Sequence, residues 1–351
     1  MIGHLAFAAG SPCPTFVVDG GRLPEDQDGL LEYLTEARRY LVAAGGSHVL
    51  KIALVQPSPH PMFDLEYRFV QALPGAVGRF DLRGSCGHSI LSAVAAAERM
   101  SMVPRLVPGA RVRVHVLNND DQVVCEVDRV ARDTIGFTVH FVRRRPVPLT
   151  DLLVTGTPRT TLISDGERHE VSLVSSGNPY VFVDARHLGI AVADQLFAAD
   201  EALFARMVRI RLAAADRLGW PREGAFPKVA AILPIGGGQV AARAISVPSW
   251  HPTIALTGAV CLASALRIPG SVTAAVAEEA GVLAGATEIV TAGGRTCVTA
   301  ATGEVSGRPA LIWASVAGKH VDFQGSFLLE PLARLHFEEI SRCLALSATP
   351  A

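Results

Sequence analysis

One cysteine in the sequence has neighbours that favour reactivity. Cys86 lies in GSCGHS at residues 84–89, directly ahead of an alanine- and leucine-rich stretch typical of a helix. A thiol at a helix N-terminus meets unpaired backbone N–H groups and the positive end of the dipole, which can lower its pKa from about 8.5 to about 3.5–7.5. The flanking glycines let a small molecule approach the sulfur. Such a thiol can exchange protons with a substrate, whereas the simpler alternative is a small buried cysteine at a helix start.

A lysine inside an apolar strand is the second candidate. Lys51 lies in HVLKIALV at residues 48–55, and a continuous apolar strand is typically buried on both faces. A lysine there is costly unless its ammonium lines a cleft, where a neighbouring thiol would make it a proton donor or acceptor with a shifted pKa. The alternative is a lysine that reaches out of an edge strand. Lys228 lies in a matching strand, and both interpretations apply to it as well.

The elements that would position these residues occur twice in the chain. Each half shows, in the same order, two β-rich runs, an amphipathic helix, an apolar strand with one lysine, small residues leading into a helix, and a strand pair. In the first half these are residues 5–19, 27–42, 47–57, 83–93 and 108–127; in the second half they are residues 171–184, 199–218, 224–234, 255–265 and 284–305. Five matched blocks predict an internal duplication, with a ligand site in the cleft between the halves.

The two halves differ where chemistry is expected. Aligning the helix starts places Ser85 over Thr257 and Cys86 over Gly258, so the predicted site contains one thiol. The unpaired N–H groups at a helix start form a natural cradle for a carboxylate. We therefore predict substrate-binding roles for the residues at both helix starts, namely Ser85, Gly87, His88, Thr257, Gly258 and Ala259.

Length and composition agree with two α/β domains. The chain has 351 residues, more than one compact core usually contains, and 49% of them are hydrophobic against 19% charged. We expect one half at residues 1–160 and the other at residues 161–351. A Pro/Thr-rich connector is predicted around residues 143–165 and a C-terminal helix around residues 328–346.

Charge and cysteine spacing argue against several classes of protein. A net charge of −1 provides no broad field for nucleic acid or an anionic membrane, and the basic run Arg143–Arg145 is expected to be a solvated turn. The six cysteines show neither a CxxC pair nor metal-ligand spacing with histidine, so we expect no metal and no disulfide framework. Neither a signal peptide nor a membrane span is recognisable, and a cytoplasmic location is the expectation.

Several segments, taken in order, resemble the 2-methylaconitate cis-trans isomerase (PrpF) family: GGSHVLKIALVQPS, GSCGHS, SSGNPYVFV, FPKVAAILP and LTGAVC. The resemblance covers about residues 5–328. It implies the α/β fold of the diaminopimelate epimerase type, in which two similar halves each wrap a sheet around a central helix. It also implies proton transfer by Lys51 and Cys86, a carboxylate-binding role for Asn178 and Lys228, and no organic cofactor. A homodimer is left open.

Two departures from the family concern the substrate. The family's N-terminal loop R-G-G-T-S-K-G appears here as AGSPCPT at residues 9–15, and its H-P-S-G appears as AATG at residues 300–303. A polycarboxylate would lose several charge-assisted hydrogen bonds, each of about 1.5–3 kcal/mol. We therefore expect a small unsaturated acid with fewer charges, from secondary metabolism such as the synthesis of alkylproline units of antibiotics.

Three activities are compatible with these residues. The first is an allylic or cis-trans double-bond isomerase, which moves a proton between carbons of the substrate. The second is an amino-acid racemase or epimerase of the same fold, which would use two opposed cysteines; Gly258 argues against it, because Cys261 lies a helical turn further on. The third is a carboxylate-binding protein without catalysis, which the presence of both Lys51 and Cys86 disfavours.

Overall fold

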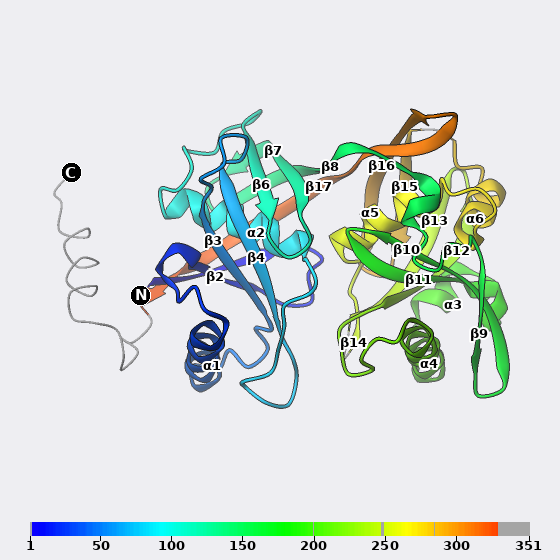
Figure 1. The fold of residues 1–351 in the computed structure, drawn as a ribbon, viewed down its shortest axis with the longest axis horizontal. Coiled ribbons are helices and arrows are strands. Elements are labelled where there is room, and N and C mark those ends of the chain that lie inside the picture. The colour runs from blue at the N-terminus through cyan, green and yellow to red at the C-terminus, as the bar shows by residue number, and fades with distance from the viewer. Residues whose placement is uncertain (1, 199, 247–248, 284, 329–351) are drawn as a thin grey trace.

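The computed structural model describes residues 2–198, 200–246, 249–283 and 285–328, which form two halves lying side by side (Figure 1). The strands of the first half are β1 (Ile2–Ala8), β2 (Thr15–Asp19), β3 (Lys51–Pro57), β4 (Leu65–Ala72), β5 (Phe80–Asp81), β6 (Arg111–Val116), β7 (Asp121–Ala131) and β8 (Thr134–Pro148). Its α-helices are α1 (Gln27–Ala43) and α2 (Gly87–Arg99), and its 3₁₀ turns are η1 (Gly20–Arg22) and η2 (Leu149–Leu152).

The second half repeats this order. Its strands are β9 (Thr160–Ser164), β10 (Glu167–Ser176), β11 (Asn178–Asp184), β12 (Lys228–Gly236), β13 (Gln239–Ser246), β14 (Ser249–Trp250), β15 (Ala286–Thr291) and β16 (Gly294–Val305). Its helices are η3 (Ala185–Leu188), α3 (Ala193–Phe197), α4 (Glu201–Leu218), α5 (Leu256–Ala265) and α6 (Val272–Ala280), and the long strand β17 (Arg308–Leu328) follows.

Strand pairing shows the same duplication. In the first half β2 and β3 are parallel, β3 and β4 antiparallel, and β4 and β6 parallel. The second half has the same sequence of pairings in β11, β12, β13 and β15. Lys51 and Lys228 are the first residues of β3 and β12, so the repeat places one lysine at the same position of each half.

Each half wraps its strands around one buried helix, as the sequence predicts. All residues of α5 are buried, and so are those of α2 from Gly87 to Ala97. Both helices consist mostly of alanine and other small or apolar residues, and a helix that is apolar all round is stable only inside a core. A large apolar cluster runs through both halves and contains these two helices, while smaller clusters lie under the amphipathic helices α1 and α4.

Strand β17 connects the two halves. It pairs with β16 of the second half and then with β8 and β1 of the first half, and Figure 1 shows it running from one half to the other. The boundary at residue 160 stays a prediction. The predicted C-terminal helix falls outside the described residues, except for Leu328, which ends β17.

Two expectations about residues 143–165 are wrong in part. Residues 143–148 continue strand β8 rather than forming a connector, and only η2 and a short segment separate β8 from β9. The Arg143 side chain is 16% exposed and pairs with Asp121, so it does not lie in a solvated turn. The sequence could not reveal this partner, because the two residues meet only when β7 and β8 pair.

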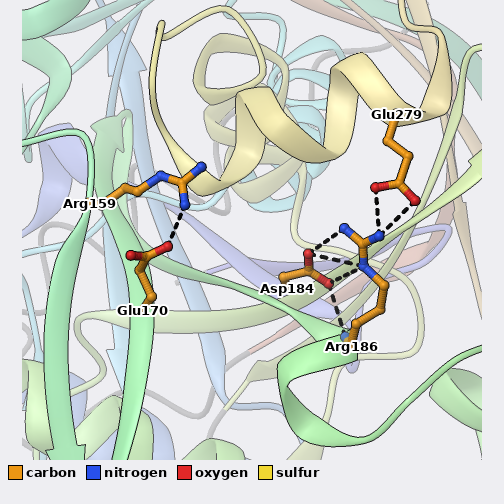
Figure 2. Close-up of polar contacts among 5 residues, drawn as sticks. All are labelled: Arg159, Glu170, Asp184, Arg186 and Glu279. Carbon is orange, nitrogen blue, oxygen red and sulfur yellow. Dashed lines mark hydrogen bonds and ion pairs between the residues drawn. The ribbon is translucent and has the colours of Figure 1, made fainter.

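The second half carries two helices, the short α3 and α6, that the described residues of the first half do not match. Figure 2 shows how α6 is attached: Arg186 donates hydrogen bonds to Asp184, at the end of β11, and to Glu279 of α6. These bonds raise the pKa of Arg186. A second ion pair, between Arg159 and Glu170, lies near the start of β9 and β10 (Figure 2). No helix in the described part of the chain is long and apolar enough to cross a bilayer.

The close packing of α5 predicts a stability change. A Cβ atom at Gly258 would lie 2.3 Å from Tyr180 Oη of β11, so Gly258→Ala should lower the free energy of unfolding by about 1–3 kcal/mol. In Gly21→Ala the nearest atom to the new methyl is 3.4 Å away, and a change below about 0.5 kcal/mol is expected. Urea unfolding of both variants measures the difference, and equal stabilities would contradict the packing described for α5.

Candidate active site

Cys86 occupies the residue immediately before helix α2. Its backbone is extended, with φ −135° and ψ 106°, and the helix begins at Gly87. The Cys86 carbonyl accepts hydrogen bonds from the hydroxyl of Tyr67 (3.2 Å) and from the N–H of Ile90 (3.0 Å). The thiol is therefore held at the N-terminus of the central helix, where the sequence predicts it.

The surroundings of Cys86 favour its thiolate. Burial by itself raises the pKa of the thiol, but the positive charge of Lys51, a hydrogen bond from Ser89 and the charge of Lys228 together lower the pKa below its ordinary value. The Ser89 hydroxyl lies 3.0 Å from that of Thr15. These contacts join α2 to the beginning of strand β2.

Lys51 projects from the interior of the sheet into the same region. Strand β3 has a neighbour on each side, β2 and β4, so Lys51 does not belong to an edge strand. Its side chain is buried, and Nζ donates a hydrogen bond of 2.8 Å to the hydroxyl of Ser11. Ser11 in turn donates to the carbonyl of Cys13. Sequence reasoning did not single out Ser11, because it lies 40 residues from its partner.

One pocket between the two halves contains the predicted proton-transfer pair. It is a narrow pocket with about 400 Å³ of empty space, open solvent included. Its lining includes Lys51, Ser85, Cys86, Lys228, His251 and Thr257. Five other predicted binding residues do not line it: Gly87, His88, Asn178, Gly258 and Ala259.

Asn178 connects the two helix starts instead of offering free donors to a ligand. Its Oδ1 accepts from the N–H of Ser85 (3.1 Å), and its Nδ2 donates to the carbonyl of Ser85 (2.7 Å) and to Oγ1 of Thr257 (3.0 Å). Both amide hydrogens are therefore used within the protein. The side chain thus bridges the halves, and its expected carboxylate-binding role stays a prediction.

The N–H groups at the second helix start are only partly free. The N–H of Ala259 donates to the carbonyl of Ala255 (2.8 Å), which is the first bond inside α5, so this N–H is already paired within the helix and the expected binding role of Ala259 stays a prediction. Thr257 and Gly258 belong to the first turn, whose N–H groups have no acceptor within the helix. The two helix starts are close together, because a Cβ atom on Gly87 would lie 2.5 Å from the Leu256 side chain.

Buried polar groups lie in the pocket lining and next to it. Both ring nitrogens of His88 and the hydroxyl of Ser85 are buried without a hydrogen-bond partner among the described residues. The ring of His88 stacks 5.9 Å from that of His251, whose Nδ1 accepts from the N–H of Thr253. Burial, followed by the charge of nearby lysines, holds the pKa of both histidines well below the usual value, so both rings are neutral.

Two further lysines add positive charge. Lys228 is half-buried, and burial lowers its pKa to about 8. Lys319 of β17 is buried, donates to the hydroxyl of Thr296 (2.9 Å), and also has a pKa of about 8 because of burial. Sequence reasoning missed Lys319, although a lysine between apolar residues was the signal that identified Lys51. Within the described ranges, no His, Cys, Asp or Glu cluster has the arrangement of a metal site.

Comparison with known proteins identifies the family. The family model described as PrpF protein matches residues 41–304. The chain belongs to the PrpF family. The putative isomerase YbhH of Escherichia coli (strain K12) is 28% identical to this PrpF chain over 288 residues, which cover 74% of this chain and 80% of YbhH. The 3-methylitaconate isomerase of Eubacterium barkeri is 26% identical, with 66% of this chain and 71% of that protein covered.

A solved structure shares the fold of this PrpF-family chain. The crystal structure of methylitaconate-delta-isomerase matches it with a TM-score of 0.63 and 20% sequence identity, over 96% of this chain and 99% of that one. The two similar halves wrapped around central helices are therefore the fold that the sequence predicts. Together with the family match, the relatives identify the chain as an isomerase.

The electrostatic contact between Lys51 and Cys86 can be measured directly. In Lys51→Met the pKa of Cys86 loses its main lowering influence, so the pH midpoint of alkylation by iodoacetamide should rise. Mass spectrometry of the peptide that contains Cys86 measures the rate at each pH. The exposed Cys297 in the same sample is the internal reference, whose midpoint should not move. Identical Cys86 midpoints in the two proteins would contradict the contact.

Proposed function

We propose that this isomerase moves a proton along the allylic system of a small unsaturated carboxylic acid, without a cofactor, and that Lys51 and Cys86 exchange the proton. The observation that carries the proposal is that the two side chains line one narrow pocket, where the charge of Lys51 lowers the pKa of the Cys86 thiol. A thiolate beside an ammonium supplies a proton acceptor and a proton donor at one place.

The proposed reaction requires one proton acceptor and one proton donor. The deprotonated member of the pair takes a proton from the carbon next to the double bond, and the electron pair delocalises toward the carbon at the far end. The substrate then receives a proton at that far carbon, from the same group or from the protonated partner, so the double bond moves and the atoms balance. Either Lys51 or Cys86 can be the first acceptor in this scheme.

The positive charge of the pocket supports an acidic substrate. The N–H groups at the two helix starts, together with Lys51 and Lys228, would stabilise a carboxylate and the negative charge that develops when the proton leaves. The name of the Eubacterium barkeri relative, 3-methylitaconate isomerase, points to the same class of compound. The proposed partner is thus a small carboxylic acid.

The proposed substrate carries one or two carboxylates and belongs to secondary metabolism, such as the synthesis of alkylproline units. Support comes from Ala9, Pro14 and Ala300, which stand where the family is expected to have charged or polar groups. Ala300 is buried in β16. Its methyl group makes no polar contact in place of the histidine that the family motif has there. Lys319 adds one cation that the sequence-based inventory did not contain.

An epimerase of the same fold is the second candidate, and the geometry disfavours it. That reaction needs a second thiol opposite Cys86, where this chain has Gly258. The nearby Cys261 donates its S–H to the carbonyl of Val174 (3.3 Å), and burial raises its pKa to about 12. A neutral thiol engaged in the core does not serve as a base. The non-catalytic alternative remains open to the experiment that follows.

Replacement of either member of the pair should abolish exchange. We expect Cys86→Ala and Lys51→Ala to lower deuterium incorporation from D₂O by about 10²–10⁴-fold, while the thermal unfolding midpoint stays within a few degrees. Proton NMR with a panel of unsaturated acids that begins with 3-methylitaconate measures the exchange. Cys261→Ala is the matched control and should keep it. Near-normal exchange in Cys86→Ala or Lys51→Ala would remove that residue from the mechanism.

The substrate proposal has its own measurement. With purified protein, we expect negligible turnover of 2-methylaconitate and measurable turnover of an unsaturated mono- or dicarboxylic acid, because one arginine, one lysine and one histidine of the family motifs are replaced. Steady-state assays compare kcat/KM for the two kinds of acid. A value for 2-methylaconitate of about 10⁴ M⁻¹s⁻¹ or more would show that the missing charges do not restrict the substrate.

A further inference from the structure

We propose that the buried ion pair between Asp121 and Arg143 is a positioning device, which holds the turn at residues 176–178 so that Asn178 fixes the gap between the two helix starts. The two charged residues come from the first half, whereas the turn connects β10 and β11 of the second half. Because the device acts on the proposed proton-transfer site through Asn178, its role in turnover rests on the proposed function. Its effect on Cys86 can be measured without turnover.

The ion pair reaches across to the second half. Arg143 donates from Nη1 to Oδ1 of Asp121 (3.1 Å) and from Nη2 to the hydroxyl of Ser176 (2.8 Å). The two charged side chains are only 16% and 6% exposed. Ser176 also lies within 3.1 Å of the hydroxyl of Ser264 in α5, so one guanidinium joins β7 to the strand and the helix of the other half.

A second connection acts on the turn itself. Asn119 donates from Nδ2 to Oδ2 of Asp121 (2.8 Å) and to the carbonyl of Gly177 (3.3 Å). Gly177 has φ +92°, a conformation that residues with a side chain rarely adopt. The turn is thus fixed on both sides of Gly177, and the next residue is Asn178.

Asn178 needs this precision because its amide makes three bonds at once. They join Ser85, immediately before Cys86, to Thr257 at the start of α5, at distances of 2.7–3.1 Å. A small shift of the turn would lengthen all three hydrogen bonds. Because hydrogen bonds weaken steeply outside this range of distances, the bridge between the helix starts would be lost. The ion pair therefore acts on Cys86 through Asn178, without touching the pocket lining.

The corresponding turn of the first half is held differently. There the hydroxyl of Thr253 donates to the carbonyl of Gly10 (3.1 Å), and the described residues show no ion pair at this contact. An ion pair thus acts on the side where Asn178 bridges the halves, whereas in the other turn the Lys51 ammonium contacts the neutral hydroxyl of Ser11. Removing one partner of a buried ion pair costs more free energy than removing one partner of an exposed pair. The Asp121–Arg143 contact is therefore the more sensitive of the two to substitution.

Alkylation of Cys86 by iodoacetamide at pH 7 tests the device. Arg143→Met and Asn178→Ala should each raise the alkylation rate by roughly three- to tenfold, because the helix starts separate and the buried thiol becomes accessible. The double variant should react no faster than Asn178→Ala alone. Ser176→Ala removes the hydroxyl that contacts Arg143 and Ser264 but keeps the Asp121–Arg143 pair; it should act in the same direction, and serves if Arg143→Met fails to fold.

Arg186→Met is the matched control. It removes an arginine that pairs with Asp184 at the opposite end of strand β11 from Asn178 (Figure 2), and the Cys86 alkylation rate should stay unchanged. A wild-type rate in Arg143→Met, or effects of Arg143→Met and Asn178→Ala that multiply, would overturn the positioning role. Deuterium exchange is measured separately: its absence with every acid, beside the expected alkylation pattern, would reject the isomerase proposal and leave the device in place.

Discussion

The two central helices point their N-termini at each other, and the rest of the site follows from this constraint. Each helix start leaves N–H groups without acceptors and carries the positive end of a dipole. The approach is close enough that a side chain on Gly87 would collide with Leu256. The Asn178 amide bridges the two ends, and burial holds the pKa of the nearby His88 and His251 rings well below the usual value. Burial also lowers the pKa of Lys228 and of Lys319 to about 8.

The same arrangement explains how the Cys86 thiol can be buried and still have a lowered pKa. Burial works against the thiolate of Cys86, and the opposing influences come from three separate elements, strand β3, strand β12 and helix α2 itself. Strands and a central helix hold side chains more rigidly than loops do. The duplication provides the frame, and the difference between Cys86 and Gly258 makes the two sides chemically unequal.

The sequence revealed what local pattern can reveal. The duplication and its helix and strand blocks were predictable because each block has its own periodicity, and Lys51 and Cys86 stood out because each interrupts its surroundings. Asn178 was found through the family resemblance, but its bridging contacts were not, because its partner Ser85 is 93 residues away. The interpretation of Arg143 was wrong for the same reason: three consecutive arginines suggest a solvated turn until strand pairing brings Asp121 beside the first of them. The pairing of the Ala259 N–H inside α5 was not foreseen, because the residue at which a helix begins is hard to read from sequence.

Strand β17 has a consequence for how the chain is made. The edges of β1 and β8 in the first half acquire their partner only when residues 308–328 have been synthesised. A ribosome adds about 5–20 residues per second, and domains that are continuous in sequence fold as they emerge. Here the N-terminal half must wait with two unpaired strand edges, which are templates for association with other chains. Truncation before residue 308 would make that exposed state permanent, so synthesis of the full chain protects the first half from aggregation.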